Sequence, residues 1–128
     1  MNTALTQVAF VTGASSGMGK ETALRLLDKG FIVYVAARRL ELMTDLQERG
    51  AIAIQMDISK EEQIVAAIQK VEAAHGGIDV LINNAGFGMY GSMEESTIAD
   101  ARYQFEVNLF GLARLTQLAL PYMRQKGA

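Results

Sequence analysis

The chain has 128 residues, of which 50% are hydrophobic and 20% are charged, and its formal net charge is -2 at pH 7. This composition fits a single folded domain or part of one, and without a long lysine or arginine run it argues against a nucleic-acid partner. The sequence has no cysteine, no signal-peptide pattern and no apolar run long enough to cross a bilayer, so we expect a cytoplasmic protein without disulfides or a membrane partner.

An apolar strand followed by a glycine-rich turn opens the chain. Residues 8–11 (V-A-F-V) form the unbroken apolar run of a strand that is buried on both faces of a parallel sheet. Glycines follow at Gly13, Gly17 and Gly19, and a helical pattern runs from about Gly17 to Gly30. Because glycines let the backbone approach a phosphate and the first N–H groups of a helix point at it, this pattern predicts a nucleotide pyrophosphate site. The alternative interpretation is a tight turn without a ligand.

Strand and helix patterns then alternate along the chain. The β-branched and aromatic run at residues 31–37 predicts a second buried strand, and residues 51–56 and 78–82 predict two more. Apolar spacing predicts helices at 40–49, at 60–75 and from about 96 to 121. A strand, a helix and a strand in succession form a right-handed βαβ unit, which requires parallel pairing. The sequence therefore predicts an α/β fold.

Three motifs resemble those of one enzyme family. The turn at residues 12–19 (T-G-A-S-S-G-M-G) resembles the T-G-x-x-x-G-x-G signature of the short-chain dehydrogenase/reductase family, and residues 83–86 (N-N-A-G) and 107–111 (V-N-L-F-G) resemble two further family motifs. The resemblance implies a Rossmann-type doubly wound parallel sheet in strand order 3-2-1-4, with three α/β/α layers. It covers essentially all of residues 1–128, which we interpret as one partial dinucleotide-binding domain, truncated before the fifth strand.

The end of the second strand predicts the preferred cofactor. NAD sites carry an acidic residue here for the ribose hydroxyls, whereas an arginine suits the 2′-phosphate of NADP. Ala37 takes the acidic position by resemblance, and Arg38 and Arg39 follow it. We therefore expect NADP(H) rather than NAD(H), with Arg38 as the main phosphate ligand and Ser15 as a second contact. The alternative is that two arginines lie at a solvated strand end.

Two further strand ends complete the predicted cofactor site. The resemblance implies that Asp57 and Ile58 hold the adenine, although Asp57 is also suited to a turn or helix cap. It also places the N-N-A-G segment against the ribose, while its buried amides are expected to tie strand ends together. The predicted cofactor-binding residues are Gly13, Ser15, Ser16, Gly17, Met18, Gly19, Arg38, Arg39, Asp57, Ile58, Asn84, Ala85 and Gly86.

Asn108 is the only predicted catalytic residue. It interrupts an apolar helical stretch, and the resemblance implies that it holds a water linking an active-site lysine to solvent; the alternative is a kink satisfied by a helix carbonyl. The family's serine, tyrosine and lysine are missing. Tyr122 and Lys126 match the Y-x-x-x-K spacing, but they lie on the helix of Asn108 with no serine between, so we interpret them as structural.

The remaining polar signals point to structure. The only histidine, His75, lies in the last turn of a predicted helix, where an imidazole suits the carbonyl end, and no metal site is expected. Ser59 and Glu62 resemble a capping box for the same helix.

The sequence predicts an NADP(H)-dependent oxidoreductase that transfers a hydride between nicotinamide and a small-molecule carbonyl or alcohol substrate. By the same prediction the full-length form is a homo-oligomer, and this chain carries the cofactor half and is inactive alone. The alternative is a non-catalytic NADP(H)-binding sensor or interaction module.

Overall fold

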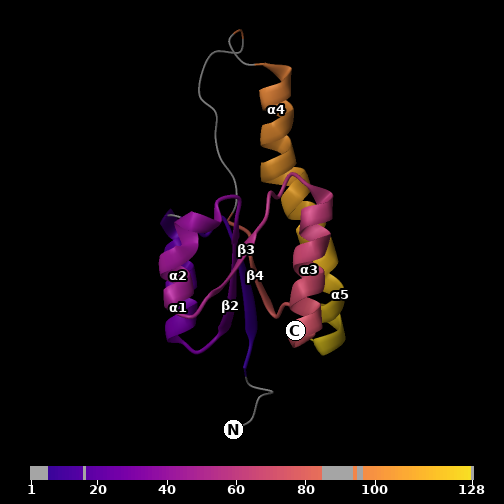
Figure 1. The fold of residues 1–128 in the computed structure, drawn as a ribbon. Helices are drawn as coiled ribbons and strands as arrows, with labels where there is room; N and C mark the ends of the chain where they lie inside the picture. Colours follow the sequence, from indigo (N-terminus) through magenta and orange to yellow (C-terminus); the bar gives the residue numbers. More distant parts are fainter. Residues whose placement is uncertain (1–5, 16, 85–93, 95–96, 128) are drawn as a thin grey trace.

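A parallel sheet lies at the centre of the computed structural model, which describes residues 6–15, 17–84, 94 and 97–127 (Figure 1). Within these residues the sheet has four strands in the order β3-β2-β1-β4, which confirms the predicted order. All pairings are parallel, with Phe10 in register with Tyr34 on one side and with Leu81 on the other. The strands are β1 (Val8–Thr12), β2 (Ile32–Ala37), β3 (Ile52–Gln55) and β4 (Val80–Ile82).

Helices cover both faces of the sheet (Figure 1). α1 and α2 lie on one face and α3 and α5 on the other, while α4 extends past the edge at which the strands end. None of the described helices is long and apolar enough to span a membrane. The helical segments are α1 (Gly17–Asp28), η2 (Leu40–Met43), α2 (Thr44–Glu48), α3 (Glu61–His75), α4 (Ile98–Phe105), η3 (Glu106–Gly111) and α5 (Leu112–Lys126).

Burial on both faces of the sheet explains the unbroken apolar run in β1. All five residues of β1 are buried, because successive side chains enter the cores on opposite faces of the sheet. Phe10 packs in the core that contains Ile64 of α3 and Leu115 of α5. Val11 packs in the other core, with Ala23 of α1. This double burial fixes the carboxyl end of β1, and with it the glycine turn that follows.

The predicted capping box of α3 is wrong. The N-cap residue is Lys60, and no side chain caps the helix. Ser59 bonds to the preceding turn instead of capping the helix. Its N–H and its hydroxyl donate to Oδ1 of Asp57, at 2.9 and 2.7 Å. A carboxylate two residues away is a stronger acceptor than the capping arrangement offers, so the predicted turn role of Asp57 is confirmed.

The predicted helical stretch from 96 to 121 differs from the observed one in two ways. It divides into α4, the π-helical η3 and α5, and the last helix continues past Pro121 to Lys126. Proline removes one backbone hydrogen bond from the helix, and contacts of the final turn hold the helix beyond it. The Tyr122 ring packs on Gly77, where a Cβ atom would lie 2.3 Å from Cγ, and Lys126 bonds to Asp79.

Candidate functional site

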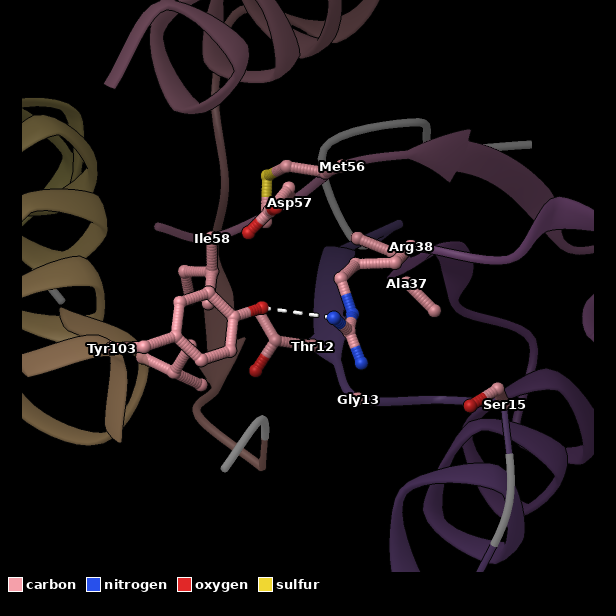
Figure 2. A pocket seen from close by; sticks show the side chains of 11 residues that line it. Thr12, Gly13, Ser15, Ala37, Arg38, Met56, Asp57, Ile58 and Tyr103 are labelled. Carbon is pink, nitrogen blue, oxygen red and sulfur yellow. Dashed lines mark hydrogen bonds between the residues drawn. The ribbon is translucent and has the colours of Figure 1, made fainter. Parts of the chain in front are cut away.

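A cavity of about 190 Å³ opens at the carboxyl ends of β1, β2 and β3 (Figure 2). Ligands of open α/β sheets bind at this edge. The volume is below the roughly 300–1,000 Å³ of pockets that enclose a drug-sized ligand, so the cavity suits one end of a dinucleotide. Its lining residues are Thr12, Gly13, Ser15, Ala36, Ala37, Arg38, Met56, Asp57, Ile58, Tyr103 and Val107.

The glycine turn beside this cavity is built for close backbone approach. Gly13 and Gly17 have φ angles of 63° and 60°, a region that favours glycine. Gly19 is required for packing, because a Cβ atom there would lie 2.4 Å from the Gly13 carbonyl oxygen and 2.5 Å from Nδ2 of Asn84. α1 begins at Gly17 and has no acidic side chain in its first turn, so its positive dipole end stays available to an anion.

Asn84 ties the end of β4 to the glycine turn. Its backbone N–H donates to Oγ1 of Thr12 at 2.9 Å, and its side-chain Nδ2 donates to the Gly13 carbonyl at 3.3 Å. The neighbouring amide of Asn83 donates to Oγ1 of Thr116 in α5, at 3.0 Å. The predicted tying of neighbouring strand ends is therefore confirmed for Asn84, whereas Asn83 ties the end of β4 to helix α5.

The two adjacent arginines have different surroundings. Nη1 of Arg38 donates to the hydroxyl of Tyr103 at 2.9 Å, and both side chains line the cavity (Figure 2). Arg39 turns away and pairs with Glu41, its Nε lying 3.1 Å from Oε1. A backbone hydrogen bond and the Arg39 guanidinium lower the pKa of Glu41. Arg39 is therefore neutralised by a carboxylate, whereas no salt bridge to Arg38 is found among the described residues.

Asp57 and Ile58 also line the cavity (Figure 2). The bonds that the backbone N–H and the hydroxyl of Ser59 donate both end on Oδ1 of Asp57. Within the described residues Oδ2 therefore keeps its lone pairs for a donor in the cavity, such as an exocyclic amine. The turn role of Asp57 and its predicted adenine role are compatible.

The predicted poor helical fit at Asn108 coincides with the π-helical η3. Such π-bulges are often found at functional sites. Val107, just before it, lines the cavity, whereas half-buried Asn108 does not. Gly111, at the end of η3, packs directly against the loop that follows β3. A Cβ atom on Gly111 would lie 2.3 Å from the carbonyl oxygen of Ile58. The segment that carries Asn108 is thus fixed against the cavity wall.

The structure brings five of the predicted site residues into the cavity lining: Gly13, Ser15, Arg38, Asp57 and Ile58. Others lie outside the lining, in the turn, beside it or on η3: Gly17, Met18, Gly19, Arg39, Asn84 and Asn108. Three predicted residues lie outside the described residues: Ser16, Ala85 and Gly86. Sequence reasoning missed Tyr103 entirely, and no local signal points to it, because its partner Arg38 is 65 residues away.

Tyr122 and Lys126 lie at the other edge of the sheet. Lys126 Nζ is 2.8 Å from Oδ1 of Asp79, which directly precedes β4, and it lies 5.5 Å from the centre of the Tyr122 ring. The hydrogen bond to Asp79 raises the pKa of Lys126. β1 begins at this edge, and its five residues separate it from the glycine turn by roughly 15 Å. Tyr122 and Lys126 therefore hold α5 against the amino ends of the strands.

His75 also serves packing. Its Nδ1 lies 2.8 Å from the hydroxyl of Tyr34, and the two rings meet edge to face at 5.7 Å. Burial raises the pKa of Tyr34. In the part of the chain that the structure describes, no group of three or more His, Asp or Glu side chains is arranged to hold a metal ion.

A parallel sheet in this order, with a glycine turn leading from β1 into a helix, defines a Rossmann-type α/β domain. The chain belongs to the short chain dehydrogenase family, whose family model matches residues 7–128.

Similar proteins include enzymes of this family from bacteria and from a metagenome. A probable short-chain type dehydrogenase/reductase, VdlC of Helicobacter pylori, is 37% identical over 119 residues, which are 93% of this chain and 44% of that protein. The crystal structure of a short-chain dehydrogenase from Streptomyces avermitilis has a TM-score of 0.92 and 41% identity, covering 96% of this chain and 46% of the other. A metagenomic short-chain oxidoreductase solved in complex with NADP has a TM-score of 0.88 and 35% identity, covering 94% of this chain and 57% of the other. The chain thus spans about half the length of each of these proteins.

Proposed function

We propose that this chain is the cofactor-binding half of an NADP(H)-dependent oxidoreductase acting on a small-molecule carbonyl or alcohol. The observation that carries the proposal is the Arg38 guanidinium, which lines the cavity at the end of β2 with a neutral hydroxyl as its partner. Family membership and the NADP complex of a similar enzyme support it. When bound, the cofactor supplies or accepts the hydride.

The described residues fit such a cofactor. Gly17 has open space where a Cβ atom would stand, so a pyrophosphate has access to the backbone N–H groups at the start of α1. Ser15 and Arg38 lie on the side of the cavity nearest this turn and would hold the 2′-phosphate (Figure 2). Asp57 and Ile58, which also line the cavity, would hold the adenine. Asn84 fixes the turn itself through the Gly13 carbonyl.

The preference for NADP over NAD follows from charge. The lining residue at the end of β2 is Ala37, so no carboxylate is present there to bind the ribose hydroxyls or to repel a 2′-phosphate. A guanidinium has five N–H donors, and Arg38 uses one of them in its hydrogen bond to Tyr103. The remaining donors and the full positive charge stay available to a phosphate.

Replacing Arg38 with glutamine is expected to weaken NADPH binding about 10- to 100-fold, the usual worth of hydrogen bonds to a charged group. NADH binding should stay within about twofold, because NADH has no 2′-phosphate. Fluorescence titration of both cofactors measures this. Arg39→Gln is the matched control. Because Arg39 is already paired with Glu41, this substitution should leave both affinities unchanged. An equal loss for NADPH and NADH, or tighter binding of NADH by the unmodified chain, would contradict the proposal.

The 128-residue chain alone is expected to show no NADPH-dependent reduction of aldehydes or ketones. Its one Y-x-x-x-K pair, Tyr122 and Lys126, lies at the edge of the sheet opposite the cavity. No tyrosine–lysine pair of that spacing therefore reaches a bound nicotinamide. NADPH absorbance, followed over a panel of carbonyl substrates, tests this, and turnover by the pure chain would refute it.

The same placement of Tyr122 and Lys126 favours one second candidate, a non-catalytic NADP(H)-binding module. Both candidates bind NADPH, so binding does not separate them. The intact mass of the protein isolated from its natural source does: a substantially longer polypeptide supports the oxidoreductase, and the mass of the 128-residue chain supports the module.

A further inference from the structure

Tyr103 reaches the cofactor cavity from a helix that the strand-end motifs do not include. It lies on α4, is half-buried, and packs its ring against the core that contains α3 and α5. Its hydroxyl projects toward Arg38, and Figure 2 shows the two side chains meeting across the cavity. The ring is thus anchored by the core while the hydroxyl faces the phosphate-binding side of the site.

Arg38 is held at two points. Its backbone carbonyl accepts a hydrogen bond from Nε2 of Gln55 on β3, at 3.1 Å, and its Nη1 donates to Tyr103. An exposed arginine otherwise samples many rotamers, and binding must overcome the entropy of ordering them. A guanidinium that is already ordered loses less on binding a phosphate.

The chemical nature of this second anchor matters. A carboxylate in the position of Tyr103 would order Arg38 but would also neutralise it, as Glu41 does to Arg39. The hydroxyl of Tyr103 is a neutral acceptor, so it orders the guanidinium and leaves its charge uncompensated.

We propose that Tyr103 is a positioning residue for recognition of the 2′-phosphate of NADP(H), acting by holding the Arg38 guanidinium over the cavity. This inference rests on the proposed cofactor preference. It predicts that the hydroxyl of Tyr103 contributes to affinity only for ligands that carry a 2′-phosphate, and only when Arg38 is present.

The test uses two small probes in place of the whole cofactor, adenosine 2′,5′-bisphosphate and adenosine 5′-monophosphate. Calorimetric titration compares the unmodified chain with Tyr103→Phe, Arg38→Gln and the double variant. Tyr103→Phe should weaken binding of the bisphosphate about tenfold, as expected for a hydrogen bond to a charged group, and leave the monophosphate within about twofold. In the Arg38→Gln background the same change should have no further effect. Tyr122→Phe, which removes a tyrosine hydroxyl at the opposite edge of the sheet, is the control.

Each other outcome has a defined meaning. Tighter bisphosphate binding by Tyr103→Phe would show that the hydroxyl competes with the phosphate, and an equal loss in the Arg38→Gln background would show a purely structural role. Either result overturns the inference about Tyr103 and leaves the cofactor preference standing. If the unmodified chain fails to prefer the bisphosphate, the NADP preference itself fails, and the inference fails with it.

Discussion

Replacing Gly19 with alanine is expected to abolish tight NADPH binding and to lower the free energy of unfolding by about 3 kcal/mol, the upper end of the usual cost of overpacking. The new Cβ atom would lie 2.4 Å from the Gly13 carbonyl oxygen and 2.5 Å from Nδ2 of Asn84. The first of these is a backbone atom that cannot rotate away. The start of α1 must therefore move away from the end of β1.

That movement accounts for the loss of binding. Gly13 and the first turn of α1 both contribute to the proposed pyrophosphate site, and the Asn84 amide, which donates to the Gly13 carbonyl at 3.3 Å, fixes the position of Gly13. A Cβ atom at Gly19 occupies the space of that amide, so both the packing and the hydrogen bond are disturbed.

Urea unfolding and NADPH fluorescence titration measure the two effects. Gly17→Asn is the control for stability: its Cβ meets nothing within 4 Å, and asparagine tolerates the φ of 60°, so the loss should stay near 1 kcal/mol or below. Gly19→Ala that binds NADPH with unchanged affinity would contradict this account of the turn.

The sheet could be predicted from the sequence because its determinants are local. Residues 8–11 and 31–37 are apolar at every position, and this pattern requires a strand covered on both faces. The glycines of the turn identify the edge at which a ligand binds, since Gly13 and Gly17 adopt positive φ there. Strand order followed from the family resemblance, and the assignment of Arg38 from the general rule for dinucleotide sites, not from periodicity.

The features that the sequence did not predict depend on contacts between distant segments. Ser59 has the spacing of a capping residue, but the Asp57 carboxylate is the nearer acceptor, and only the geometry of the turn decides between them. Tyr103 resembles any other half-buried helical aromatic until α4 is placed above the end of β2.

Replacing Asp79 with alanine is expected to lower the free energy of unfolding by about 1–3 kcal/mol while leaving NADPH affinity unchanged. The Asp79 side chain is 6% exposed, and its Oδ2 accepts the backbone N–H of Val8 at 2.8 Å. Its Oδ1 accepts from Lys126 Nζ at 2.8 Å. Alanine leaves the buried Val8 N–H without this acceptor, a loss that costs about 1–3 kcal/mol, and it also releases the end of α5.

Asparagine at the same position separates the two contributions. Asp79→Asn keeps an oxygen acceptor for the Val8 N–H and loses the charge opposite Lys126, so its effect on unfolding should be smaller than that of alanine. Because the bond to Asp79 raises the pKa of Lys126, the contribution of the lysine is fully present below its ordinary value of 10.5 and is lost as the pH rises through the raised value.

The NADPH affinity of Asp79→Ala decides whether Asp79 and its partner Lys126 have only a structural role. Asp79 and Lys126 lie at the amino ends of the strands, whereas the proposed site lies at the carboxyl ends, beyond the five residues of β1. Chemical unfolding should therefore respond to Asp79→Ala while the fluorescence titration, performed where the variant is folded, does not. A variant of unchanged stability with weakened NADPH binding would instead connect Tyr122 and Lys126 to the cofactor, and the interpretation of this pair as a structural fastening of α5 would be wrong.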